Sequence, residues 1–151
     1  MAPTNKSSHP VFSHTDGIAA DMGDALLLLG RVLIAALFIA TAWPGSPTVG
    51  YLTSLGLSNP AFWSVVAITV EYVFALSLIL GIATRYGALL GILYVIVATA
   101  LAHRYWEYPQ AQQLVQYIFF TKNLAILGGL LYVFVNGAGR FSIDRNLSGK
   151  R

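Results

Sequence analysis

Four long apolar stretches, separated by short polar segments, organise the 151-residue chain. They cover residues 25–43, 61–81, 86–103 and 114–135, and each is close to the ~20 residues that a helix needs to cross a bilayer. A helix satisfies its own backbone hydrogen bonds in lipid, whereas an isolated strand does not. The pattern therefore predicts an all-α protein, an integral membrane four-helix bundle.

The polar segments divide the chain into three parts. Residues 1–24 are polar and lack hydrophobic periodicity, so we expect a flexible N-terminal tail. Residues 25–136 form the expected four-helix domain, and residues 137–151 form a basic C-terminal tail. Within the domain, Asn59 followed by Pro60 is typical of a capped helix start.

Small residues recur at a spacing of four in three of the predicted spans. The pairs are Gly87 and Gly91, Ala36 and Ala40, and Ala125 and Gly129. Such pairs let two backbones approach closely in a membrane, where lipid offers no hydrophobic drive for association. We therefore expect these faces to pack between helices.

The nine lysines and arginines are distributed unevenly around the predicted spans. Six fall on the side shared by the two tails and the second loop, Arg104 alone falls on the other side, and two lie within spans. Lysine and arginine are enriched on the cytoplasmic side of membrane proteins, so we expect both termini in the cytoplasm. Trp43, Trp63 and Trp106 then gather at the outer interface, where aromatic belts occur.

The composition supports the membrane class. Of all residues, 56% are hydrophobic and 10% are charged, against about 25% charged in soluble domains. No basic run suggests a nucleic-acid partner, so the lipid bilayer is the first partner that we expect. The chain has no cysteine, which excludes a disulfide framework, a thiolate metal site and a cysteine nucleophile.

Three charged residues, Arg31, Glu71 and Lys122, lie inside the apolar stretches. A charge at the bilayer centre costs about 2.5–3.5 kcal/mol on insertion scales and is usually paired or functional. Counting along ideal helices places Glu71 and Lys122 near mid-membrane and Arg31 closer to the inner side. Asn123 adjoins Lys122 but points about 100° away, so we expect it to serve a different helix pair.

Three interpretations of this intramembrane polar cluster stay open. In the first, Glu71 and Lys122 form a structural ion pair while Arg31 extends to the cytoplasmic face. In the second, the cluster lines a pocket that binds a headgroup, such as a quinone carbonyl, or passes protons. In the third, it is a buried contact with a partner subunit.

A second polar group is expected at the outer end of the third span, where His103 precedes Glu107 by four residues. The two share a helix face if the helix continues, but an interfacial histidine is also typical of a simple polar helix end. The loop offers too few ligands for a metal, so we expect none. No nucleotide-binding or haem-attachment motif is present, so we expect no intrinsic cofactor and consider only a diffusible quinone.

Several short motifs, in this order, make the chain similar to the DoxX family of small bacterial and archaeal membrane proteins. The similarity extends from Leu27 to Arg145. The motifs are Leu29-Gly30-Arg31, Gly56 to Pro60, Glu71, Gly81 to Arg85, His103, Phe120 to Ala125, and Gly137 to Arg145. The resemblance implies a four-helix protein of the bacterial inner (cytoplasmic) membrane.

Members of the wider family resemble subunits of thiosulfate:quinone oxidoreductase or terminal quinol oxidase systems, or membrane partners of redox-defence enzymes. The resemblance thus implies an accessory subunit of a respiratory or other redox or energy-transducing membrane complex, which packs against larger subunits and contributes to a quinone site. The alternatives are a stand-alone quinone-linked component of the thiosulfate:quinone oxidoreductase type, and a small transporter or proton path. Whether the chain is an enzyme stays open, because a family names a fold better than a reaction.

Overall fold

The computed structural model describes residues 10–42 and 48–147. Their helices are α1 (Pro10–Thr41), α2 (Thr48–Ser54), α3 (Pro60–Leu80), α4 (Thr84–Ala102), η1 (Tyr105–Glu107), α5 (Gln110–Asn136) and α6 (Ile143–Leu147). Four stretches are long and apolar enough to cross a membrane, namely Met22–Thr41, Pro60–Leu80, Thr84–Glu107 and Gln110–Asn136. The predicted all-α architecture with four membrane-spanning helices is confirmed.

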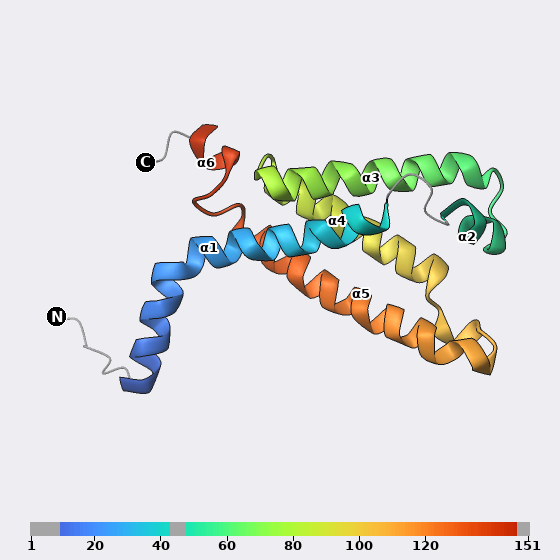
Figure 1. The fold of residues 1–151 in the computed structure, drawn as a ribbon, viewed down its shortest axis with the longest axis horizontal. Helices are drawn as coiled ribbons and strands as arrows, with labels where there is room; N and C mark the ends of the chain where they lie inside the picture. The colour runs from blue at the N-terminus through green and yellow to red at the C-terminus, as the bar shows by residue number, and fades with distance from the viewer. Residues whose placement is uncertain (1–9, 43–47, 148–151) are drawn as a thin grey trace, which may run out of the picture.

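The four long helices form a splayed bundle (Figure 1). Helix α1 packs against α3 and α5, α3 packs against α4, and α4 packs against α5, while the short α2 packs on α3. Figure 1 shows α1 and α5 close together near α6 and separating toward the opposite end, where α2 lies. These two ends of the bundle are termed the α6 end and the α2 end below.

A small apolar core joins α1, α3, α4 and α5. Phe38 and Phe74 are buried and meet edge to face, with their ring centroids 4.7 Å apart. Gly87 and Gly91 are buried in α4, and a β-carbon on Gly87 would lie 2.1 Å from the hydroxyl oxygen of Ser77 in α3. The close helix approach predicted for this pair of glycines is therefore confirmed.

The other small residues divide between packed and exposed positions. Gly129 faces α1, where an added β-carbon would lie 3.1 Å from the side chain of Ile34. Ala36, Ala40 and Ala125 are exposed, so the packing predicted for them is wrong. Spacing along a helix defines a face, but it does not say which way that face is turned.

The predicted start of the second span is confirmed. The side chain of Asn59 accepts a hydrogen bond from the backbone nitrogen of Phe62 at 3.4 Å, and Pro60 opens the helix. This arrangement satisfies one of the orphan backbone donors of the first turn.

The N-terminal tail predicted over residues 1–24 is wrong from residue 10 onward, because α1 begins at Pro10. Proline is well placed at a first helical position, where its missing N–H is not needed. No further proline interrupts the sequence between Pro10 and Thr41. Residues 1–9 lie outside the described part of the chain, as do Trp43 and the rest of residues 43–47.

Two further segments are helical where the apolar pattern predicts loops. The connection between the first two spans contains α2, and α5 begins at Gln110 rather than near residue 114. The predicted C-terminal tail is also folded through residue 147, with α6 within it. Helix α2 lies beside a cavity, and α6 is hydrogen-bonded to the start of α4 at the opposite end of the bundle.

The C-terminal segment supplies the cap of α4. The two carboxylate oxygens of Asp144 accept hydrogen bonds from the backbone nitrogens of Ala83 at 2.7 Å and Thr84 at 2.9 Å. The hydroxyl of Thr84 donates a third at 2.8 Å. Ala83 has a left-handed backbone and no cap of its own. A residue 60 positions away therefore performs the capping that local sequence usually provides.

Candidate ligand cavity

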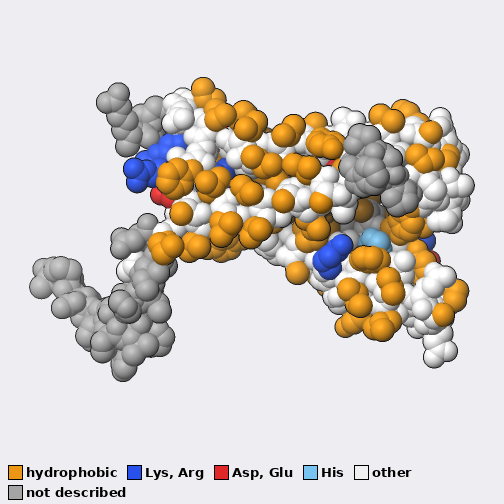
Figure 2. Space-filling model, viewed as in Figure 1, with side chains coloured by type: hydrophobic (Ala, Val, Ile, Leu, Met, Phe, Trp, Pro, Cys, Tyr) orange, Lys and Arg blue, Asp and Glu red, His pale blue; other side chains and the backbone are white. Residues whose placement is uncertain are grey.

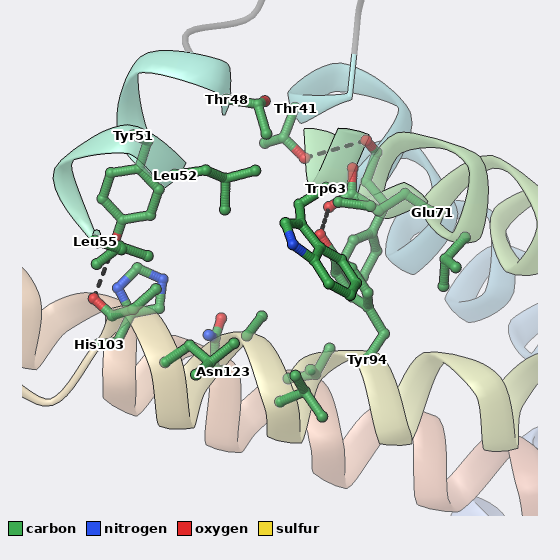
Figure 3. Close-up of a pocket in the computed structure, with 18 of the residues that line it drawn as sticks. Thr41, Thr48, Tyr51, Leu52, Leu55, Trp63, Glu71, Tyr94, His103 and Asn123 are labelled. Atoms are coloured by element: carbon green, nitrogen blue, oxygen red, sulfur yellow. Dashed lines mark hydrogen bonds between the residues drawn. The ribbon is translucent and has the colours of Figure 1, made fainter. Parts of the chain in front are cut away.

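A cavity of about 730 Å³ lies between the helices toward the α2 end (Figure 3). This volume is within the range of roughly 300–1,000 Å³ that is typical of small-molecule sites. Its walls are largely apolar and aromatic, and they include Phe38, Leu52, Trp63, Val70, Leu101 and Phe119. The polar side chains that reach it are Thr41, Thr48, Tyr51, Glu71, Tyr94, His103, Lys122 and Asn123. An apolar cavity with a few converging polar groups is the usual form of a binding site.

Glu71 is one of the residues that line this cavity, and its side chain is hydrogen-bonded to a tyrosine. The hydroxyl of Tyr94 in α4 donates a hydrogen bond to Oε1 of Glu71 in α3. Glu71 follows Pro60 by 11 residues in α3, about 17 Å along the helix axis. The carboxyl group therefore sits close to the middle of the span, and its partner is a tyrosine rather than the lysine of the ion-pair interpretation.

Lys122 and Asn123 both line the cavity but make separate contacts. Nζ of Lys122 lies 4.8 Å from the centroid of the Phe119 ring, one turn earlier in α5. Nδ2 of Asn123 donates to Oγ1 of Thr99 in α4 at 2.8 Å. The ion pair between Glu71 and Lys122, the first of the three interpretations, is absent among the described contacts, since each of the two has a different neighbour. The expectation that Asn123 serves another helix is consistent with its bond to α4.

Arg31 does not belong to this cavity. It is fully buried at the α6 end, where Nη2 donates to the carbonyl oxygen of Phe141 at 2.6 Å. The other two guanidinium nitrogens have no hydrogen-bond partner within the described part of the chain. In the first interpretation Arg31 extends to the cytoplasmic face, but its side chain is buried because the C-terminal segment folds back over it. The intramembrane cluster divides into a cavity group and a separate buried arginine.

A shared helix face for His103 and Glu107 required the third span to continue, and α4 ends at Ala102. Nδ1 of His103 lies 2.8 Å from Oε1 of Gln116 in α5. Glu107 instead forms an exposed ion pair with Arg104 at 3.1 Å. His103 thus belongs to the cavity wall, whereas Glu107 does not. Among the described residues, no three His, Cys, Asp or Glu side chains gather to hold a metal.

Two tyrosines of the site were missed by sequence analysis. Tyr94 is the partner of Glu71, and its hydroxyl within an apolar span was the available signal. Tyr51 projects from α2 toward the cavity, as Figure 3 shows, and its hydroxyl donates to the carbonyl oxygen of Ala102 at 2.8 Å. Burial, with the neighbouring Tyr108 hydroxyl, raises the pKa of Tyr51 above its usual range. This bond ties α2 to the end of α4 across the cavity.

Comparison with known proteins finds a family model described as DoxX that matches residues 26–104. The inner membrane protein YphA of Escherichia coli (strain K12) is 32% identical over 124 residues, which are 80% of this chain and 89% of that protein. The inner membrane protein YqjF of the same organism is 30% identical over 131 residues, or 84% of this chain and 95% of that protein. The ER-derived vesicles protein ERV29 of Saccharomyces cerevisiae is 28% identical over 119 residues, or 79% of this chain and 33% of that protein. No solved structure matches significantly.

Proposed function

The chain belongs to the DoxX family, and on that premise we propose that it binds a lipid-soluble ligand of the quinone class in the cavity at the α2 end. In this proposal it is an accessory subunit of a redox complex in the bacterial inner membrane. Its similarity to two inner membrane proteins of Escherichia coli supports the location. The distribution of lysine and arginine supports an orientation with both termini in the cytoplasm.

The observation that carries the proposal is the combination of cavity shape and wall chemistry. The cavity lies within the predicted membrane thickness, so its ligand is soluble in lipid. Rings of Phe38, Trp63 and Phe119 line its walls, and such rings pack well against a planar quinone ring. The volume of about 730 Å³ accommodates a quinone head with the first part of its tail.

The polar groups of the cavity match the needs of a quinone head, which presents carbonyl oxygens as hydrogen-bond acceptors. The ammonium of Lys122 donates hydrogen bonds, and the pair formed by Glu71 and Tyr94 offers an exchangeable proton in an otherwise apolar wall. A buried carbonyl gains from such donors because no water competes there. In this role the chain binds and orients the ring, and the electrons pass to or from a redox centre in another subunit.

The test begins with purification of the tagged protein from its native membrane in a mild detergent. Mass spectrometry of co-purifying chains and chromatography of extracted lipids would follow. A stoichiometric redox complex with bound quinone is the expected result. A lone protein with bound quinone would favour the stand-alone alternative, and a preparation that contains no quinone would contradict the site.

A variant pair makes the test residue-specific. Glu71→Leu removes the hydrogen-bonding carboxyl from the cavity wall and leaves an apolar side chain in its place. We expect it to weaken the binding of a short-chain ubiquinone about tenfold, which corresponds to about 1.4 kcal/mol. Glu107→Leu removes an exposed carboxylate outside the cavity and is the matched control. Equal affinities of the two variants would contradict the assignment of the site.

A further inference from the structure

Among residues 10–42 and 48–147, no acidic side chain forms an ion pair with the ammonium of Lys122. Lys122 lies 12 residues after Gln110 in the 27-residue α5, about 18 Å from the start of the helix. Its side chain is exposed, and its ammonium group lies over the ring of Phe119. The acidic residue of the same cavity, Glu71, takes its hydrogen bond from Tyr94. A lysine in this position is costly unless something compensates its charge.

The cavity opens sideways, so the compensating group can come from outside the chain. Its lining includes Ala40 and Thr41 of α1 as well as Phe119 and Lys122 of α5, and all four are exposed. Figure 2 shows a basic and a histidine side chain at the edge of a hollow between α1 and α5. Figure 1 shows these two helices separating toward the α2 end. A ligand therefore reaches the ammonium from the lipid, between α1 and α5.

Resting on the proposed quinone-class site, we propose that Lys122 makes the cavity selective for ring ligands that carry an ionised oxygen, such as hydroxyquinones. A neutral carbonyl accepts a hydrogen bond from the ammonium but leaves its charge uncompensated. An ionised oxygen accepts the same bond and neutralises the charge, and such charge-assisted bonds are about twice as strong as neutral ones. The low dielectric of the surroundings increases this difference further.

Several other polar side chains of the cavity wall are engaged in contacts within the chain, so Lys122 is the group that we expect to bind an ionised oxygen. Tyr51 and Tyr94 are neutral hydroxyls whose protons go to Ala102 and Glu71. The amide nitrogen of Asn123 donates a hydrogen bond to Thr99 of the neighbouring helix. The ring of His103 lies within hydrogen-bond distance of the side chain of Gln116. A cation–π contact with Phe119 is weaker than pairing with an anion. The selectivity therefore resides in a single ammonium at the opening of the cavity.

The experiment compares two probes of nearly the same shape. 2-Hydroxy-1,4-naphthoquinone is ionised at pH 7, whereas 2-methoxy-1,4-naphthoquinone is neutral. Their dissociation constants would be measured by quenching of tryptophan fluorescence, with the protein in phosphatidylcholine nanodiscs. We expect wild type to bind the hydroxy probe about tenfold more tightly than the methoxy probe. Lys122→Met should reduce this ratio to about one while changing the methoxy affinity little, and Lys122→Arg should preserve it.

The controls separate failure of the selectivity from failure of the site. Arg104→Met removes an exposed cation outside the cavity and should leave the ratio unchanged. If wild type and Lys122→Met bind both probes with the same ratio, the selectivity is refuted while the quinone-class site stands. If wild type binds neither probe, both proposals fail. If nanodiscs that contain phosphatidylglycerol abolish the preference, Lys122 binds a lipid phosphate, which also overturns the selectivity.

Discussion

Replacing Asp144 by asparagine is expected to loosen the α6 end of the bundle. The carboxylate accepts three hydrogen bonds from the start of α4, two from backbone nitrogens and one from the Thr84 hydroxyl. An asparagine keeps one acceptor oxygen and turns its NH₂ group toward donors. It therefore loses one of the three bonds when the oxygen faces Thr84, and two when the oxygen faces Ala83.

The expected size follows from these contacts. One or two lost hydrogen bonds contribute about 1 kcal/mol each, and the lost negative charge at a helix N-terminus contributes about 0.5 kcal/mol more. The sum is about 1.5–2.5 kcal/mol. For a chain of this length, 1 kcal/mol corresponds to roughly 2–4 °C in Tm, so Asp144→Asn should lower Tm by about 3–10 °C.

The pH dependence gives a second signature of the same contact. Burial alone would raise the pKa of Asp144, but hydrogen bonds from Thr84 and Ala83 and the charge of Arg31 lower it below its usual value of 3.8. A carboxyl group with a lowered pKa stabilises the fold above its unfolded value and loses this contribution as the pH falls through the folded value. Wild type should therefore lose part of its stability below about pH 4, and Asp144→Asn should not show this component.

The assay is thermal unfolding in dodecyl maltoside, followed by the helical circular dichroism signal between pH 3 and pH 7. Glu107→Gln is the matched control, because it removes a carboxylate whose ion pair with Arg104 is exposed. Exposed pairs contribute about 0–1 kcal/mol. The reasoning is refuted if Asp144→Asn lowers Tm no more than Glu107→Gln at pH 7.

Two further predictions concern packing at the α6 end and within the bundle. Arg31→Met removes the hydrogen bond to the Phe141 carbonyl, so trypsin should cleave after Arg145 several times faster in detergent, and unchanged cleavage would contradict this role. Gly87→Ala places a β-carbon against α3 and should destabilise by about 1–3 kcal/mol. Gly128→Ala, where nothing lies within 4 Å, should be neutral or stabilising because alanine favours helix. Equal unfolding temperatures for the two alanine variants would refute the close packing.

The position of each polar group along its helix could be predicted, but its partner could not. Counting along α3 predicts Glu71 near mid-membrane, but that count does not reveal that Glu71 bonds to Tyr94 rather than to Lys122. A residue number determines depth at about 1.5 Å per residue, whereas the partner depends on helix order and on the rotation of each helix about its axis. The exposed Ala36 and Ala40 fail as predicted packing residues for the same reason.

The sequence by itself determined the four spans, the capped start of α3 and the close glycine contact of α4. Each of these depends on residues within one helix or its immediate flank, so hydrophobic length, a capping side chain or a missing β-carbon is sufficient. Tertiary structure alone decided that Asp144 caps a helix 60 residues earlier and that Arg31 is enclosed by a segment 110 residues later. It also decided that α2 and the four long helices surround one cavity, because such contacts arise only when distant segments fold together.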